Sequence, residues 1–413
     1  MKNRPGYLII LVLLAMAVTL SCGPQTLTLS PQSPKISKTS TLDPTREIDF
    51  TETSPGVDQV TIDKLAKTEE VLSKIKVQTS TPIVEEFDGI EIAYVYSREL
   101  ITALYHLYGT DALDSIVDIT LTNHDPKTVT LIVETSIEGY TTKAMDTVHL
   151  ESGATVELHQ NPRLTAEALD KLNSEKPGNF LIKVTKTNPE PASVLLDEST
   201  EIRLRSRRDF VFIDGVPFNE EYDYLAAWVT PTDPKVEKLI RSAANYTKNG
   251  ITESGYKKDQ LNDKDGSVWD RLQAVWQAEA KDYNLTYVST MVAFGPNTIQ
   301  RIRLPSEVLD QASGNCMETS ILFAAAAEAM SLESNLIRIP GHMYVGVRMD
   351  QTNANYYFIE TTLIGRSSFA DAVKSGEKEW NDALPHFQAK EEGYRWITVQ
   401  DAWGKGIMPI PWN

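Results

Sequence analysis

The segment Gly314-Asn315-Cys316-Met317-Glu318 stands at the head of an apolar, alanine-rich run. Apolar residues recur after it at helical spacing, at Ile321, Leu322, Ala324, Ala325, Met330 and Leu332. This spacing predicts a buried helix with Cys316 in its first turn, where unpaired backbone N–H groups and the positive end of the helix dipole favour a thiolate. Gly314 permits the tight approach that such a turn needs. The alternative is that Cys316 is a small buried hydrophobe, as most free cysteines are.

Two polar residues follow the cysteine in positions that suit an acid–base pair. Pro340-Gly341 predicts a turn, and a strand is predicted to begin after it, near His342. The polar turn 350–355 leads to the predicted antiparallel partner 356–361, which brings Glu360 within a few residues of facing His342. Cys, His and a carboxylate in this order form a candidate nucleophile, base and orienter. The alternative is a surface hairpin with an ordinary ion pair.

Together these segments resemble bacterial transglutaminase-like domains, in which a Cys at the start of a helix packs against strands that carry a His and an acid. The resemblance rests on Phe294-Gly295, Gln300, Leu304-Pro305-Ser306-Glu307-Val308-Leu309, the segment 314–318, Pro340-Gly341-His342-Met343-Tyr344-Val345-Gly346-Val347 and Ile359-Glu360-Thr361-Thr362. It covers roughly Phe218 to the C-terminus and implies a papain-like fold. It also implies that Cys316 is the nucleophile, His342 the general base and then acid, and Glu360 the orienter.

Two of these positions leave alternatives open. Many members of the family carry Asp where this chain has Glu360, which is one methylene longer. Gln300 precedes the cysteine, where papain-like enzymes often have an oxyanion-hole side chain, and a neutral amide donor suits developing negative charge. Gln300 is otherwise a polar residue that closes a turn. Five aromatic residues either line a substrate cleft or form core and rim: Tyr344, Tyr356, Tyr357, Trp269 and Trp276.

The reaction that the resemblance implies is acyl transfer from an amide of a protein or peptide through a Cys thioester. Water would resolve the thioester in a protease or amidase, which is the leading interpretation, and a lysine amine would resolve it in a cross-linking enzyme. The second interpretation is a non-catalytic, lipid-anchored binding module that keeps the fold. We expect no cofactor and no metal site, because no His pair or Cys pair has ligand spacing and no acidic loop has calcium-site spacing.

The first 22 residues have the composition of a lipoprotein signal peptide. Lys2 and Arg4 precede the apolar segment 7–20, which is too short for a comfortable membrane span. The segment Thr19-Leu20-Ser21-Cys22 resembles a bacterial lipobox, with Thr where Leu is usual. We therefore expect export and lipid attachment at Cys22, which would hold the protein at the cell membrane outside the cytoplasm. An ordinary cleaved signal peptide or an uncleaved anchor is the alternative.

Length and composition divide the rest of the chain. With 413 residues, 41% hydrophobic and 23% charged, the sequence is long enough for two ordinary domains and tails. Residues 23–60, rich in Ser, Thr and Pro, predict a disordered tether. Residues 61–210 predict short helices at 61–77 and 97–109 and then period-two strands, which are typical of an antiparallel immunoglobulin-like β-sandwich. A helical insertion is expected at 164–172, and the last two of these strands at 192–196 and 200–204. Residues 211–413 switch to helical spacing, so we expect an α+β protein whose second domain is transglutaminase-like.

The net charge of −17 limits the classes of partner. Nucleic acids and anionic membrane surfaces are bound through a basic face, which this balance disfavours. We therefore expect a protein or peptide substrate, no nucleic acid, and contact with the membrane through the lipid anchor alone.

Overall fold

The computed structural model describes residues 82–211, 218–258, 261–289 and 299–411, all within one compact unit, Lys67–Asn413. The predicted signal peptide with Cys22, the predicted tether and a predicted helix at 61–77 lie outside the described residues. The described part combines helices and strands, so the predicted α+β class is confirmed. Within these ranges, no helix is long and apolar enough to cross a membrane.

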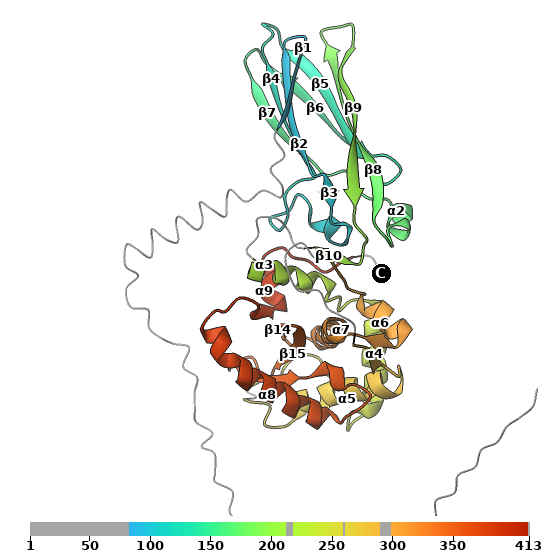
Figure 1. Ribbon diagram of the computed structural model, residues 1–413, viewed down its shortest axis with the longest axis vertical. Coiled ribbons are helices and arrows are strands. Elements are labelled where there is room, and N and C mark those ends of the chain that lie inside the picture. Colours follow the sequence, from blue (N-terminus) through green and yellow to red (C-terminus); the bar gives the residue numbers. More distant parts are fainter. Residues whose placement is uncertain (1–81, 212–217, 259–260, 290–298, 412–413) are drawn as a thin grey trace, which may run out of the picture. The chain divides into compact units, whose positions relative to one another are not determined.

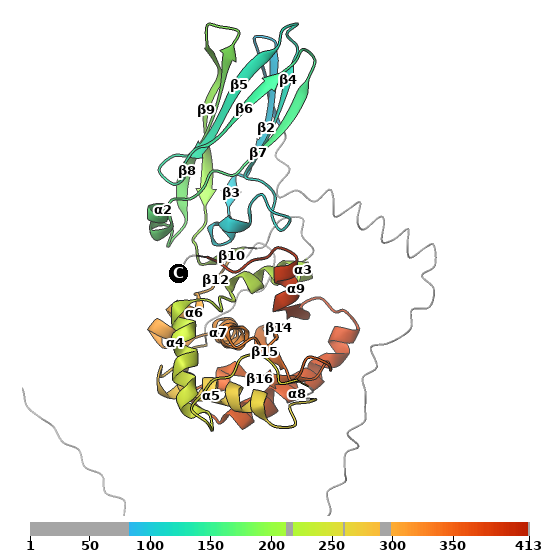
Figure 2. The ribbon, with the colours of Figure 1, turned by 180° about the vertical axis from the view of Figure 1, so that it is seen from behind.

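The first half of the described chain forms two sheets (Figures 1 and 2). One sheet has the order β1 (Ile83–Phe87), β2 (Ile90–Tyr96), β4 (Val117–Asn123), β7 (Thr155–Gln160). The other has the order β3 (Glu99–Leu100), β9 (Ser193–Leu204), β8 (Lys176–Asn188), β5 (Val129–Ile137), β6 (Ala144–Leu150). Buried and half-buried residues alternate along β2, β4 and β5, as expected for strands that pack one face on a core.

Tertiary pairing changes three predicted elements of this half. The predicted helix 97–109 is instead the short strand β3, followed by a 3-10 helix at Thr102–Leu107. Leu100 pairs with Leu204 of β9, and this ladder replaces the helical hydrogen bonds that its apolar spacing suggested. The two predicted strands at 192–196 and 200–204 are the single strand β9, while α2 (Ala166–Lys171) lies within the predicted insertion 164–172.

A further sheet, antiparallel throughout, lies at the centre of the C-terminal half. Its order is β16 (Tyr356–Ile359), β15 (His342–Arg348), β14 (Ser334–Ile339), β17 (Arg395–Thr398). Nearly every residue of β14 and β15 is buried, so both faces of this sheet are covered. Apolar side chains on one face join the main core with those of α7 (Cys316–Ala329). On the other face, Tyr344 and Phe358 form an aromatic layer with Trp380 of α8 (Phe369–Gln388).

Shorter elements complete this half. The helices are α3 (Phe218–Glu221), α4 (Pro234–Ala243), α5 (Ser267–Lys281), α6 (Pro305–Gln311) and α9 (Val399–Gly404), with 3-10 turns at Tyr222–Trp228, Ala244–Tyr246 and Thr361–Leu363. The short strands are β10 (Asp209–Val211), β11 (Thr286–Tyr287), β12 (Ile299–Arg301) and β13 (Ser313–Gly314). Both views show α7 near the centre of this region beside β14 and β15, with α5 and α8 along its rim. The 20-residue helix α8 was not predicted, because its many charges hide its buried face.

Candidate active site

Cys316 is the first residue of α7, as its position in the sequence predicts, and is 2% exposed. The helix begins with a capping box: the Asn315 side chain accepts a hydrogen bond from the Glu318 backbone N–H at 3.0 Å. The Glu318 carboxylate accepts one in return from the Asn315 backbone N–H at 3.1 Å. A Cβ at Gly314 would lie 2.9 Å from Thr319 Cγ2, so the close approach expected of this glycine is present. The box fixes the turn that carries the sulfur.

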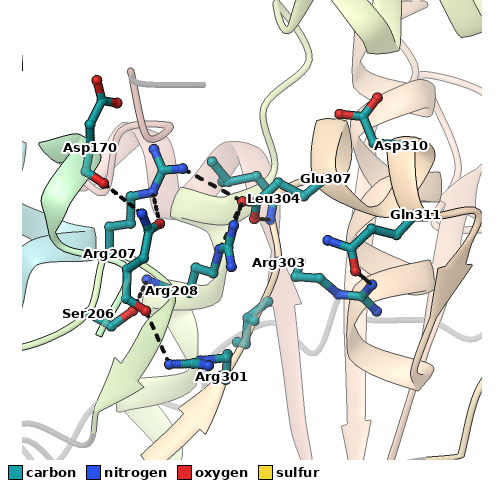
Figure 3. Close-up of polar contacts among 12 residues, drawn as sticks. Asp170, Ser206, Arg207, Arg208, Arg301, Arg303, Leu304, Glu307, Asp310 and Gln311 are labelled. Atoms are coloured by element: carbon teal, nitrogen blue, oxygen red, sulfur yellow. Dashed lines mark hydrogen bonds and ion pairs between the residues drawn. The ribbon is translucent and has the colours of Figure 1, made fainter. Parts of the chain in front are cut away.

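Arg303 holds the cap from outside the helix. Its Nε and Nη2 donate to the two oxygens of Glu318 at 2.8 and 2.6 Å, which is a bidentate pair. Figure 3 shows the neighbouring contacts, in which Arg207 and Arg208 turn towards Glu307 of α6. Arg303 also reaches Gln311, at the end of α6, at 2.6 Å. The start of α7 is therefore connected to α6 through side chains that the sequence motif does not include.

His342 begins β15, directly after the two-residue turn Pro340-Gly341, in which Gly341 has a φ of 75°. Its Nε2 lies 2.7 Å from Oε2 of Glu360, the residue that follows β16. The other Glu360 oxygen accepts from the Thr362 backbone N–H at 2.9 Å, which fixes the carboxylate. The Cys316 side chain lies within hydrogen-bonding reach of the imidazole. Because Nε2 faces Glu360, Nδ1 is the ring nitrogen left to meet the sulfur.

His342 and Glu360 shift each other's pKa. Burial alone would lower the pKa of His342, but hydrogen bonds to Cys316 and Glu360 and their negative charges outweigh it and raise that pKa to about 10. Burial alone would raise the pKa of Glu360, but its hydrogen bond to His342 and the positive charge there lower it. The imidazolium and the Glu360 carboxylate are therefore the stable forms at neutral pH.

Three hydroxyl groups connect the elements that carry the cysteine, the histidine and the acid. Thr361, one residue after Glu360, hydrogen-bonds through its hydroxyl to the hydroxyls of Thr319 and Ser320 of α7, at 2.9 and 3.0 Å. Ser320 in turn donates to the backbone carbonyl of Met343, one residue after His342, at 3.3 Å. All three hydroxyls are buried. Each catalytic candidate therefore has a neighbour in one shared network, which sets their mutual placement.

The structure adds Glu379, a residue that sequence reasoning missed. Its Oε2 lies 3.5 Å from Nε2 of His342, on the same nitrogen that faces Glu360. Burial and the charge of Glu360 raise the pKa of Glu379 to about 7. A Cβ at Gly376, one turn earlier in α8, would lie 2.5 Å from the backbone of Phe358, so helix and strand touch directly there. With its imidazole nitrogen and two carboxylates, this is the group among the described residues with the donors for a metal ion.

The other residues that the sequence suggested for the site are Gln300 and a set of aromatic residues. Gln300 is on β12, where it pairs with Phe210 of β10, and its side-chain amide donates to the Arg301 carbonyl at 2.8 Å. Its predicted place in an oxyanion hole stays a prediction. Tyr344 is 0% exposed and Trp276 is 3% exposed, so these two belong to the core rather than to a substrate surface.

The comparisons with known proteins yield only slight structural likenesses. No protein-family model matches the chain, and no curated protein matches it. Among solved structures, the chain is similar to a protein from Archaeoglobus fulgidus at 10% identity and a TM-score of 0.19, over 31% of this chain and 96% of that one. It is also similar to a protein assigned to the late embryogenesis abundant (LEA) group, at 14% identity and a TM-score of 0.17, over 37% of this chain and 91% of that one. Likenesses this slight carry no argument about fold or function.

Proposed function

We propose that the C-terminal half is a papain-like, transglutaminase-like domain that transfers an acyl group from a protein or peptide amide to water, as a protease or amidase. One observation carries the proposal: Cys316 at a capped helix start reaches an imidazole whose Nε2 lies 2.7 Å from a fixed carboxylate. A nucleophile, a base and an orienting acid in that order are what thiol acyl transfer requires.

In the proposed reaction, the Cys316 thiolate attacks the amide carbonyl, and the new C–S bond places negative charge on the carbonyl oxygen. The His342 imidazolium gives its Nδ1 proton to the leaving amine as the C–N bond breaks and a thioester remains. The neutral imidazole then takes a proton from water, whose oxygen attacks the thioester and releases the acid and the thiolate. Glu360 keeps the Nε2 proton in place throughout. The backbone N–H of Cys316, with Gln300 as the expected second donor, faces the developing oxyanion.

The rest of the assignment follows the sequence. We propose that the two sheets of the first half form an immunoglobulin-like sandwich, since nine strands make them up and burial alternates along most of these strands. We also propose export and lipid attachment at Cys22. The test is recovery of the intact protein with the membrane fraction, which Cys22→Ser should move to the soluble fraction.

Thiol labelling tests the chemistry before any substrate is known. We expect iodoacetamide to label Cys316 faster than a model thiol at neutral pH, and His342→Ala to slow that labelling by about tenfold or more. The alkaline fall in the rate of amide hydrolysis should centre near the His342 pKa of about 10, since the acid form is lost there. Glu360→Gln removes a negative charge that raises this pKa, so the fall should move to lower pH. Labelling at the model rate, unchanged in His342→Ala, would sink the proposal.

The acyl acceptor needs a separate measurement. The chain is incubated with a glutamine-containing protein and a labelled primary amine, with Cys316→Ala as the control. Ammonia release without incorporation of the amine supports hydrolysis, whereas incorporation that depends on Cys316 identifies a cross-linking enzyme.

One observation favours a second candidate, the non-catalytic binding module. Cys316 is 2% exposed, and a buried thiol packed in a core is inert. In that case Cys316→Ala should leave both stability and the biological role of the protein nearly unchanged, whereas the proposed enzyme would lose its activity.

A further inference from the structure

Three donor atoms of the kind that bind metals converge at the end of the C-terminal sheet. Nε2 of His342 and one carboxylate oxygen each from Glu360 and Glu379 all lie within 4.8 Å of one another. Nε2 is 2.7 Å from Oε2 of Glu360 and 3.5 Å from Oε2 of Glu379. They come from β15, the residue after β16, and α8, so the fold alone brings them together.

The spacing and the donor types fit a small transition metal. A tetrahedral zinc ion with bonds of about 2.0–2.2 Å holds its ligand atoms about 3.3–3.6 Å apart. The distance from Nε2 to Glu379 lies in this range, and the shorter distance to Glu360 is that of the hydrogen bond that the ion would replace. One imidazole nitrogen with two carboxylate oxygens suits zinc, whereas calcium and magnesium require more oxygen ligands than this group offers. Two carboxylates also balance the charge of a divalent ion once the imidazolium has released its Nε2 proton.

A second observation concerns the groups around these donors. Oε2 of Glu379 is shielded from solvent and faces Nε2 of His342 at 3.5 Å, with the Glu360 carboxylate beside it. The hydroxyl of Tyr344, a residue that is 0% exposed, has no hydrogen-bond partner among the described residues and is influenced by both carboxylates. Buried polar atoms are normally satisfied, so a buried hydroxyl beside two carboxylates suits a site that takes a further ligand.

Two of the three ligands are also held in advance. The Thr362 backbone N–H fixes the far oxygen of Glu360 at 2.9 Å, and the direct contact of Gly376 with Phe358 fixes the turn of α8 that carries Glu379. The side chains of His342 and Glu379 are 23% and 29% exposed, so an ion reaches the group from the solvent side. A site with fixed ligands and an open side needs little reorganisation to bind.

We propose that His342, Glu360 and Glu379 bind one divalent transition-metal ion of the zinc type, with Nε2 and one oxygen of each carboxylate as ligands. The ion displaces the proton that Nε2 shares with Glu360, and this proton passes to solvent. Nδ1 then carries the only proton of the ring and Nε2 is occupied by the ion, so the imidazole can no longer accept a proton as the base of the proposed reaction. Metal binding at this group would therefore reversibly suppress the proposed acyl transfer, and in this respect the inference rests on the proposed function and goes beyond it.

Metal binding is measured in the full chain carrying Cys316→Ala, which removes the thiol as a competing ligand and needs no turnover. Titration calorimetry with Zn²⁺ should give one ion per chain, and Co²⁺ should give the visible absorption of a tetrahedral complex. Glu379→Gln, which keeps the size of the side chain, should weaken Zn²⁺ binding by about tenfold or more. Glu377→Gln, at an exposed position two residues earlier in α8, is the matched control and should bind as the parent does. Circular dichroism checks that each variant is folded.

Two results would overturn the proposal: no binding to the Cys316→Ala chain, or equal affinities of Glu379→Gln and Glu377→Gln. A second arm uses the native chain, in which Zn²⁺ should slow iodoacetamide labelling and Glu379→Gln should relieve that effect. Protection that persists in Glu379→Gln would mean that the ion sits on the thiolate and imidazole alone, which also contradicts the proposal. Failure of the acyl-transfer chemistry leaves the calorimetric result unaffected, so the two proposals fail separately.

Discussion

The helices α7 and α8 cover opposite faces of one four-stranded sheet, and each brings one group to His342 in a different way. α7 presents Cys316 as its first residue, on a turn that is fixed by a capping box, an arginine and three hydroxyls. α8 presents Glu379 from its middle, on a turn that is fixed by direct backbone contact at Gly376. A helix end is thus positioned by polar partners and a helix middle by close packing, because only the end has unpaired backbone groups to satisfy.

The sharpest test of the α7 side is Glu318→Ala. Glu318 is 4% exposed, and its loss leaves Arg303 and the Asn315 backbone N–H without their carboxylate. Breaking a buried pair of this kind should lower the free energy of unfolding by about 4 kcal/mol, measured by urea denaturation. Glu377→Ala, at an exposed position on α8, is the control and should change it by no more than about 0.5 kcal/mol. Similar losses of stability in the two variants would contradict the view that polar partners position the start of α7.

On the α8 side, the corresponding change is Gly376→Ala. The added Cβ would lie 2.5 Å from the backbone of Phe358, so α8 must move away from β16. We expect a loss of about 3 kcal/mol in the free energy of unfolding. In Gly404→Ala, by contrast, the new Cβ meets nothing within 4 Å, and alanine is the better helix former, so stability should hold or rise slightly. Equal effects of the two substitutions would show that close packing does not position Glu379.

The third prediction concerns the charge that α8 adds. The pKa of Glu379 is raised from an ordinary 4.5 to about 7, so this group contributes stability below pH 4.5 that is lost as the pH rises through 7. Glu379→Gln cannot ionise and should therefore be more stable than the native chain at pH 8, by about 1–3 kcal/mol, with the difference vanishing near pH 4. Urea denaturation at the two pH values measures it. A difference that is independent of pH would mean that Glu379 does not titrate in this range.

The smallest expected effect is that of the hydroxyl network. Thr361→Val keeps the shape of the side chain but removes the hydroxyl that Thr319 and Ser320 share. The free energy of unfolding should fall by about 1–2 kcal/mol, since two buried hydroxyls lose a partner. The iodoacetamide labelling rate of Cys316 should also fall, because the network sets its distance to His342. Thr352→Val, at an exposed position in the turn before β16, is the control for both measurements and should change neither.

The contrast between the helices also explains what the sequence could predict. Cys316, His342 and Glu360 stand in short segments with local signals: a helix start, a Pro-Gly turn and a strand end. The structure places all three together, as those signals indicated. In the first half, the alternation of apolar and polar residues located the strands from β4 to β9, but not β1, β2 or β3. Partners distant in sequence decided β3, which replaced a predicted helix.

Glu379 carries no local signal of this kind. It lies among charged residues of a helix whose apolar positions are few, so its sequence reads as a solvated surface. The expectation of no metal site stays a prediction. It rested on ligand spacing along the chain, whereas His342 and the two carboxylates of the proposed site are spread over β15, the end of β16 and α8. Ligand spacing along a chain detects only sites built within one or two neighbouring segments.

The amino-acid sequence by itself determined the α+β class, the capped helix that begins at Cys316 and the hairpin that carries His342, because each depends on residues within a few positions of one another. Only the tertiary structure decided that α8 crosses the far face of the sheet and directs a second carboxylate at the same imidazole nitrogen. That arrangement depends on one glycine meeting one strand across the fold, and contacts of that kind leave no periodic trace in the chain.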